Sequence, residues 1–341
     1  MSEKRLVYFD ILKIFAAFGV IVIHVNGLYY HDISTTTVNW QILNFYNAIT
    51  LWCVPIFIMI SGSLFLFYKK DMPIKLLYRK YIPCIFIKIL IWAALYSIIL
   101  YRTIAVSRVL YFSVSSHLYF LYIIVLLYVI TPILSFILKR ISRQVLLYFL
   151  VFGVAFTTFC SYMFNTVPHN KFIVLCILCN EILKYIGYYI LGYYISLYGI
   201  NNIVRRLIYC CAIICFFYII LKTSSVTKTL DTVINVNPRT PLAYLSGLNT
   251  ILTTALFIFC KHLCEKLSFT FIFKQNISVI SNLTLGIYLI HNLFIYCIAS
   301  RIKILGPAAL YVPVMSFLIF IFSMLVIFLL KKIPVLRNFI I

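Results

Sequence analysis

Three ionisable side chains occur inside one apolar stretch near the start of the chain. The stretch runs from Arg5 to Tyr30 and consists mainly of Ile, Val, Phe and Ala, but it also contains Asp10, Lys13 and His24. A helix turns about 100° per residue, so Lys13 and His24 point within about 20° of each other, with Asp10 about 40° to the other side of His24. An imidazole on such a face can act as a general base or a nucleophile, and an ammonium group can stabilise negative charge.

This polar face is costly if it contacts lipid. Lys13 and His24 are separated by roughly 16 Å along the helix axis, about half of a hydrocarbon core. The face should therefore contact protein or water and have a role there. An alternative needs no chemistry, because Lys13 can extend to the cytoplasmic surface while His24 makes an interhelical hydrogen bond. The stretch alone favours neither interpretation.

A hydroxyl group and a set of basic residues follow in the next part of the chain. Ser61 lies in a Ser-Gly-Ser sequence shortly after Pro55, where small residues permit close helix packing or a local break. Residues 69–83 contain five basic side chains, and Lys75, Arg79 and Lys80 are among them. Such a cluster can bind phosphate groups, for example those of a nucleotide-bearing donor such as coenzyme A. It is also the ordinary signature of a cytoplasmic loop.

Further candidates lie in later apolar stretches. His117 is expected at the outer edge of a membrane span, among aromatic residues typical of an interfacial belt. Glu181 and Lys184 are one helical turn apart and can pair. If their helix begins near Phe172, the pair lies near the membrane midplane, where ionisable residues usually have a function; a start near Cys179 would make the pair a boundary marker. His291 can be explained as a packing or hydrogen-bonding histidine.

The composition places all these residues in a membrane protein. Of 341 residues, 64% are hydrophobic and 11% are charged, a balance that excludes a water-soluble domain. The net charge of +22 does not require a nucleic-acid partner, since cytoplasmic loops of membrane proteins are enriched in Lys and Arg. Most of the 11 cysteines lie in apolar segments, and the one Cys-x-x-Cys sequence has no second pair or nearby His. We therefore expect no metal site.

The elements that must position the candidate residues are transmembrane helices. We expect an all-α polytopic bundle that forms a single domain over residues 1–341, with no separate soluble domain and with short connections. With both termini in the cytoplasm, the inner segments hold 18 basic residues and the outer segments hold 8, which favours this orientation. Ten spans are predicted, at approximately 7–28, 48–68, 81–101, 117–138, 144–163, 178–199, 205–222, 243–262, 278–299 and 311–330.

Six fragments, in the right order along nearly the whole chain, resemble the acyltransferase family 3 membrane proteins. They are Asp10 to Lys13 with His24, Val54 to Gly62, residues 79–83, His117 to Leu121, residues 186–193, and Gly286 to His291. The chain departs from the family pattern at Lys13, where the family usually has Arg, and at Leu76, where it usually has the first of two Arg residues. Arg and Lys differ in their ability to form paired hydrogen bonds. Arg79 matches the second of those two Arg positions.

The resemblance implies an enzyme, a membrane O-acyltransferase that moves an acetyl or other short acyl group from cytoplasmic acyl-CoA to a sugar hydroxyl. The acceptor would be a cell-surface glycan or a lipid-linked saccharide, and acetyl-CoA would be a substrate rather than a permanently bound cofactor. It also implies a multi-pass protein of the bacterial inner membrane. Under this interpretation Arg79, Lys80 and Lys75 hold donor phosphates, Lys13 positions the donor, and His24 is catalytic.

The remaining candidates would support this machinery. We expect Asp10 to orient Lys13, and we assign supporting roles to Ser61, His117, Glu181 and His291. Two interpretations of another class stay open: a carrier that moves a lipid-linked sugar or a proton-coupled solute through the bundle, and a purely structural or sensory membrane protein. A carrier is expected to show inverted repeats or paired broken helices. Neither the acceptor, the acyl chain length nor the oligomeric state can be read from the residues.

Overall fold

The computed structural model describes residues 6–30, 32–68, 73–102, 115–166, 171–233, 246–298 and 307–334, and these residues form helices and connections without a strand. The first half contains α1 (Val7–Gly27), α2 (Val38–Thr50), α3 (Cys53–Gly62), the π-helix η1 (Ser63–Tyr68), α4 (Ile74–Leu76), the π-helix η2 (Leu77–Tyr81), α5 (Ile82–Tyr101), the 3-10 helix η3 (Ser116–Leu118) and α7 (Tyr119–Leu138). The second half contains α8 (Arg143–Thr166), α9 (Lys171–Leu197), α10 (Asn202–Val233), α11 (Ser246–Lys266), α12 (Phe271–Ser281), α13 (Thr284–Cys297) and α14 (Ala308–Lys331).

The predicted all-α membrane bundle is confirmed. Within the described ranges, eight helical segments are long and apolar enough to cross a membrane, and α12 with α13 forms a ninth that bends by 50°. Helix α9 takes the place of the sixth predicted span. It begins at Lys171, which agrees with the earlier of the two predicted starts, near Phe172, and not with a start near Cys179. It contains Glu181 and Lys184 and is not among those eight segments. The cytoplasmic position of both termini stays a prediction.

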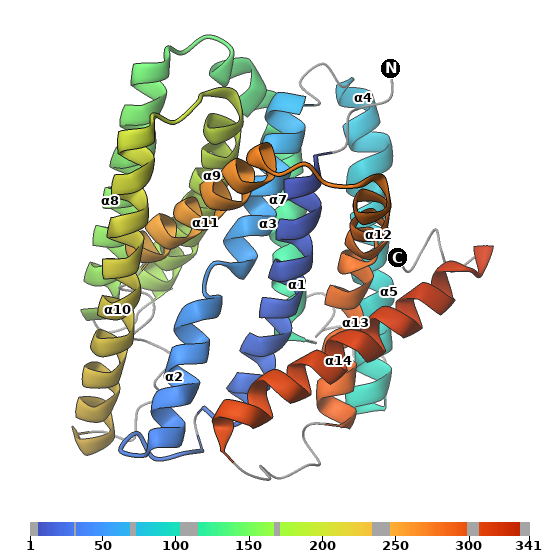
Figure 1. Cartoon of the computed structure of the whole chain (residues 1–341). Coiled ribbons are helices and arrows are strands. Elements are labelled where there is room, and N and C mark those ends of the chain that lie inside the picture. Colours follow the sequence, from blue (N-terminus) through green and yellow to red (C-terminus); the bar gives the residue numbers. More distant parts are fainter. Residues whose placement is uncertain are drawn as a thin grey trace.

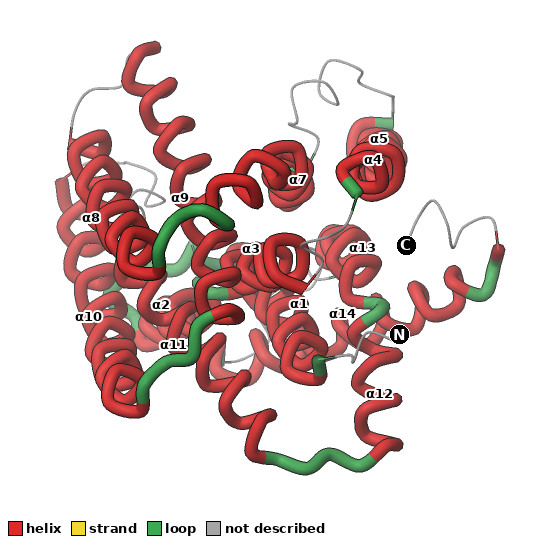
Figure 2. Tube along the Cα trace, turned by 90° about the horizontal axis from the view of Figure 1, so that it is seen from above, coloured by secondary structure: helices red, strands yellow, loops and turns green. Residues whose placement is uncertain are grey.

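Helix α1 lies inside the bundle. It contacts α2, α3, α11, α12, α13 and α14, and Figures 1 and 2 show it between α3 on one side and α13 on the other. Leu12, Ala16, Ile21 and Val25 on α1 are completely buried. The polar residues that the sequence places on α1 are therefore carried by a helix that packs against six others, which removes them from lipid.

The second span differs from its predicted range of 48–68. It begins at Val38, and α2 and α3 together form one segment from Val38 to Phe67, interrupted at Leu51 and Trp52. The hydroxyl of Thr37 accepts a hydrogen bond from the Trp40 amide (3.2 Å) and caps the start of α2. Pro55 lies in the first turn of α3, where its missing amide hydrogen is tolerated. The interruption therefore separates α2 from a new helix.

Helices α3 and α9 approach each other through glycines. A Cβ atom at Gly62 would overlap the Tyr189 carbonyl oxygen, and one at Gly192 would overlap the Met59 carbonyl oxygen. The Ser63 hydroxyl donates to Gly192 O (2.8 Å) and Met59 O (2.9 Å). The Ser-Gly-Ser sequence is thus a place of close backbone contact, as small residues in membrane helices often are.

Helix α10 is longer than its predicted range of 205–222. It continues to Val233 and takes up part of the polar segment 223–242 that the sequence assigns to a connection. The Thr227 hydroxyl donates to Thr223 O in the same helix (2.8 Å). A threonine hydroxyl can donate to a backbone carbonyl of the preceding turn of its own helix. Polar composition alone therefore does not end a helix. Residues 234–245 lie outside the described residues.

The ninth predicted span, 278–299, is a bent pair of helices that begins earlier, at Phe271. Helix α12 ends at Ser281, and α13 begins at Thr284. The Ser281 hydroxyl donates to Asp10 Oδ1 (2.6 Å), and the Thr284 hydroxyl donates to Ser281 O (2.8 Å). The bend is therefore attached to α1 near its start.

Candidate functional site

Three histidines from distant parts of the chain meet in the bundle. His24 lies in the last turn of α1, His117 in η3 and His291 in α13. The ring centroids of His24 and His291 are 5.2 Å apart, those of His117 and His291 are also 5.2 Å apart, and those of His24 and His117 are 6.2 Å apart. We call these three residues the histidine cluster.

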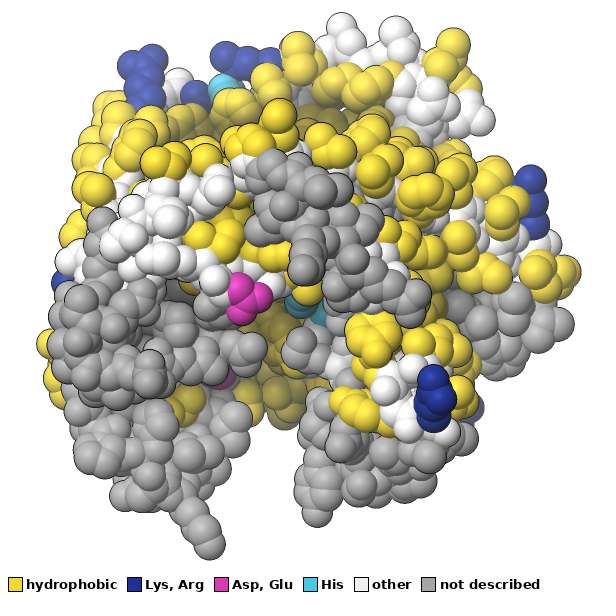
Figure 3. All heavy atoms as spheres, turned by 90° about the horizontal axis from the view of Figure 1, so that it is seen from below, with side chains coloured by type: hydrophobic (Ala, Val, Ile, Leu, Met, Phe, Trp, Pro, Cys, Tyr) yellow, Lys and Arg dark blue, Asp and Glu magenta, His cyan; other side chains and the backbone are white. Residues whose placement is uncertain are grey.

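The three rings differ in accessibility. His117 is 1% exposed and His291 is fully buried, whereas His24 is only partly buried. Figure 3 shows the face seen from below, where α1 ends and α2 begins, and a histidine side chain is visible on it. Of the three rings, that of His24 is the most accessible.

His117 is held firmly by its surroundings. Its Nδ1 lies 2.8 Å from the Ser115 hydroxyl oxygen and 3.3 Å from Asn292 Nδ2, and Asn292 Nδ2 also donates to the Ser115 hydroxyl (3.1 Å). The Tyr288 hydroxyl donates to the backbone carbonyl of His117. These contacts connect η3 to α13 and fix the orientation of the His117 ring.

His291 is held from within its own helix. Its Nδ1 lies 2.6 Å from Tyr288 O, one turn earlier in α13. The Nε2 atoms of both His117 and His291 are buried and have no hydrogen-bond partner among the described residues. Buried polar atoms are nearly always paired, so both nitrogens are available to a partner from within the cluster or from a bound molecule.

Tyrosine side chains enclose the histidine cluster. The Tyr96 ring lies 5.0 Å from the His117 ring, and its hydroxyl donates to Leu289 O (2.8 Å). The Tyr288 ring lies 5.7 Å from His117 and 5.8 Å from His291. An environment of this kind excludes water and strengthens electrostatic interactions inside it.

The polar residues near the start of α1 form a separate group. Asp10 is 4% exposed and accepts the hydrogen bond from Ser281 described above. Lys13 is partly buried. Asp10 is thus anchored to the end of α12, and its predicted role in orienting Lys13 stays a prediction.

The predicted donor-binding residues lie at the other end of the bundle. Lys75, Arg79 and Lys80 are exposed on α4 and η2, and Figure 1 shows α4 at the end where α1 begins. The structure therefore does not bring these three side chains to His24, which lies at the far end of α1. Lys13 lies between the two ends along α1.

Ser61 and Glu181 do not join the histidine cluster. Ser61 lies on α3 and is partly buried. Glu181 pairs with Lys184 at 2.5 Å on α9, and their side chains are 36% and 19% exposed. Because α9 begins at Lys171, the pair lies well inside this helix, about 15 Å from its start.

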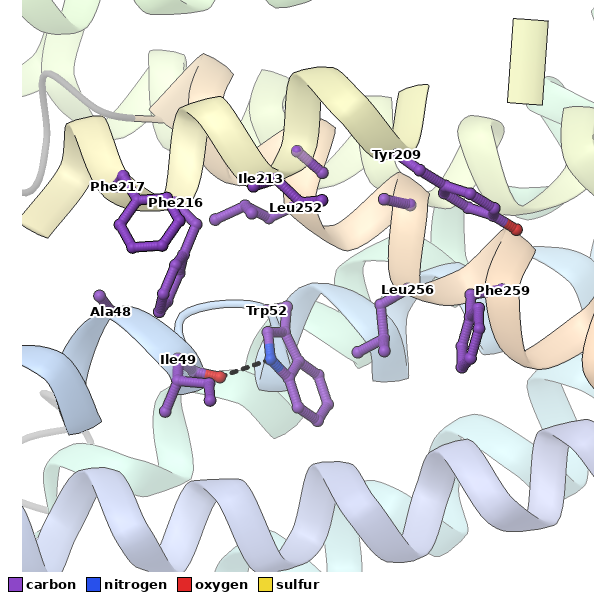
Figure 4. A pocket seen from close by; sticks show the side chains of 12 residues that line it. Ala48, Ile49, Trp52, Tyr209, Ile213, Phe216, Phe217, Leu252, Leu256 and Phe259 are labelled. Carbon is purple, nitrogen blue, oxygen red and sulfur yellow. Dashed lines mark hydrogen bonds between the residues drawn. The ribbon is translucent and has the colours of Figure 1, made fainter. Parts of the chain in front are cut away.

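The described residues contain no alternative metal centre, and one apolar cavity lies elsewhere in the bundle. No group of three or more His, Cys, Asp or Glu side chains there is arranged to hold a metal ion. A cavity of 390 Å³ lies between α2, α10 and α11 and is lined by apolar side chains such as Phe216 and Leu256. Figure 4 shows this cavity, in which the Trp52 indole N–H donates to Ile49 O (2.6 Å). It shares no residue with the histidine cluster.

The whole of this helical region matches one protein family. The family model described as an acyltransferase domain matches residues 6–331, which include every candidate residue named above. The chain belongs to acyltransferase family 3. No curated protein and no solved structure matches it. The chain is therefore a multi-pass membrane acyltransferase, and the histidine cluster lies within its matched region.

Within this family 3 acyltransferase, the sequence identifies the three histidines but does not predict that they meet. His117 and His291 were expected only to support His24. Ser115 and Asn292 were not predicted at all, although each lies within two residues of one of these histidines. Adjacency to a candidate histidine was the available signal, but the contact itself depends on how η3 packs on α13.

Proposed function

We propose that this protein transfers an acetyl or other short acyl group from cytoplasmic acyl-CoA to a sugar hydroxyl of a cell-surface or lipid-linked glycan in the bacterial inner membrane. The observation that carries the proposal is the partly exposed His24 on the central helix of a family 3 acyltransferase, in contact with two buried histidines. A reachable imidazole in a water-poor surrounding is suited to acyl transfer.

His24 acts either as the general base that deprotonates the acceptor hydroxyl or as the nucleophile that carries the acyl group. In direct transfer, it removes the proton of the acceptor hydroxyl as the oxygen attacks the thioester carbon, the carbon–sulfur bond breaks, and the proton passes to the leaving thiolate. In covalent catalysis, a His24 nitrogen attacks the thioester first and forms an acyl-histidine, which then passes the acyl group to the hydroxyl oxygen. Both routes conserve the acyl group and release CoA with its thiol protonated.

The donor is held by charge. Lys75, Arg79 and Lys80 are exposed on α4 and η2 and offer positive charge to the phosphates of CoA. Lys13, roughly 16 Å before His24 on the axis of α1, then lies on the path of the acyl-bearing arm toward His24. Lys13 orients the donor or stabilises the negative charge that develops on the thioester oxygen.

A carrier function is the second candidate, and one observation favours it. The α12/α13 pair is bent by 50°, and Ser281 at the bend contacts the buried Asp10. Carriers often bind substrates at broken helices, but such helices usually occur in symmetry-related pairs. Thermal stabilisation of the purified protein by acetyl-CoA or CoA separates the two candidates, because a carrier of lipid-linked sugar has no reason to bind either.

The test of the proposed function is His24→Ala. Transfer of radiolabelled acetyl groups from acetyl-CoA to membrane glycans should fall by at least about 100-fold, as expected for loss of an acid–base or nucleophilic group. Phe15→Ala is the matched control, because Phe15 is on the same helix and is 58% exposed; its activity should be retained. An active His24→Ala protein that inserts normally would exclude the catalytic role. Mass spectrometry of surface glycans with and without the gene would then identify the acceptor.

A further inference from the structure

The contacts of His291 determine which of its nitrogens carries the proton. Its Nδ1 lies 2.6 Å from Tyr288 O, and a carbonyl oxygen can only accept. His291 therefore donates through Nδ1. A neutral imidazole protonated on Nδ1 has its lone pair on Nε2. The buried Nε2 of His291, which has no partner among the described residues, is thus a hydrogen-bond acceptor.

The contacts of His117 determine the opposite arrangement. Asn292 Nδ2 is a donor and lies 3.3 Å from His117 Nδ1, so this nitrogen accepts and the ring proton is on Nε2. The Ser115 hydroxyl, which accepts from Asn292 Nδ2, can donate to the same His117 nitrogen. His117 therefore presents a donor where His291 presents an acceptor. Of these two buried rings, only His291 can receive a hydrogen bond through its unpartnered nitrogen.

The separation of His24 from His291 fits such a bond. Two imidazoles joined by one N–H···N hydrogen bond of about 2.9 Å have ring centroids roughly 5 Å apart, and the two rings are 5.2 Å apart. His291 Nε2 has no partner among the described residues, and χ2 of histidine has broad wells, so a rotation of the His24 ring would turn one of its N–H groups toward this nitrogen. His117 is equally near to His291, but its contacts on Nδ1 and on its backbone carbonyl prevent that rotation.

We propose that His291 is a positioning residue for His24: its Nε2 accepts a hydrogen bond from one ring nitrogen of His24, so that the other His24 nitrogen presents its lone pair to the substrate. The inference rests on the proposed catalytic role of His24. The Tyr288 carbonyl, the His291 ring and the His24 ring form a chain in which each member fixes the tautomer of the next. A serine-protease triad uses the same logic, in which a buried acceptor holds the histidine in its reactive tautomer.

The direct test measures the tautomers. Nitrogen-15 NMR of histidine-labelled protein in detergent should show His291 protonated on Nδ1, His117 protonated on Nε2 and His24 in one tautomer. In His291→Leu, His24 should populate both tautomers. A wild-type His291 protonated on Nε2, or an unchanged His24 tautomer in His291→Leu, would overturn the proposal. The wild-type measurement does not depend on the folding of any variant.

The kinetic test separates positioning from a structural role. His291→Leu should lose at least about 100-fold in kcat while KM for acetyl-CoA changes by less than about threefold, because the substrate is bound but the base is misaligned. Ser323→Ala is the control, since Ser323 on α14 is also fully buried and its hydroxyl has no partner among the described residues; its kcat should stay within about threefold. A kcat of His291→Leu within about threefold of wild type would overturn the inference.

Different variants test the catalytic role of His24 and the positioning role of His291. An active His24→Ala protein would refute the catalytic role in the proposed function. An inactive His24→Ala protein together with a fully active His291→Leu protein would leave that role intact and refute only the positioning by His291.

Discussion

Alanine at Gly192 tests the close contact between α3 and α9. Gly192 on α9 faces the Met59 backbone on α3, and an added Cβ would overlap the Met59 carbonyl oxygen. The overlapping atom belongs to a helix backbone, which cannot rotate away as the end of a flexible side chain can. The substitution must therefore push α3 and α9 apart by roughly 1 Å or more to restore van der Waals contact.

The expected cost follows from what that separation breaks. Overpacking in a well-packed interior costs about 1–3 kcal/mol, and moving Gly192 away lengthens its hydrogen bond from Ser63 (2.8 Å), which contributes about 0.6 kcal/mol on average in membrane bundles. Alanine also favours the helix over glycine by up to about 1 kcal/mol. The net destabilisation of Gly192→Ala should therefore be about 1–3 kcal/mol.

Gly187→Ala is the matched control on the same helix. A Cβ at Gly187 meets no atom within 4 Å, so only the helix-propensity gain remains. In detergent, thermal unfolding followed by tryptophan fluorescence should show Gly192→Ala melting several degrees below wild type and Gly187→Ala melting at or above it. Equal melting temperatures for the two variants would show that α3 and α9 do not meet through Gly192, and the packing described above would be wrong.

Two further predictions concern the Ser281–Asp10 contact and the basic residue Arg79 on η2. Ser281→Ala removes the hydrogen bond to the buried Asp10 carboxylate and should destabilise the protein by about 1–3 kcal/mol, whereas Ser323→Ala, which removes an unpartnered buried hydroxyl, should be close to neutral in the same thermal assay; equal shifts would refute the importance of this bond. Arg79→Gln should raise KM for acetyl-CoA about fivefold, the equivalent of roughly 1 kcal/mol, with kcat nearly unchanged. Lys274→Gln, at another exposed basic residue, is the control; an unchanged KM for Arg79→Gln would remove Arg79 from the donor site.

The sequence predicts the membrane class and the position of most spans because both depend on local composition. Hydrophobic runs long enough to cross a bilayer are visible in a single sequence. The errors concern helix ends. Helix α10 extends beyond its apolar run because the Thr227 hydroxyl bonds to its own helix, and α2 precedes the predicted second span because its 13 residues form a capped helix of mixed composition.

The histidine cluster shows the limit of this prediction. His24, His117 and His291 were each recognised as candidates from their immediate neighbours. Their meeting depends on the packing of α1, η3 and α13, which are far apart in the sequence. Helical periodicity predicts which residues share a face of one helix, but it does not predict which helices face one another.

The contacts of α1 also determine the direction of α13. Asp10 near the start of α1 contacts Ser281 just before α13, and His24 near the end of α1 contacts His291 further along α13. Both helices therefore run in the same direction. Two parallel membrane helices of one chain are separated by an odd number of other spans.

The number of spans between α1 and α13 must therefore be odd, and this requirement decides whether α9 crosses the bundle. Without α9, six spans would separate α1 from the bent pair that contains α13; with α9 there are seven. The contacts of α9 with α8 agree: Asn180 of α9 contacts Ser161 near the end of α8 (2.9 Å), and Arg143 at the start of α8 contacts Tyr194 near the end of α9 (3.3 Å). Helix α9 thus runs antiparallel to α8 along most of its length. The shared direction of α1 and α13 therefore predicts that α9 crosses the bundle as a full span, despite the Glu181–Lys184 pair inside it.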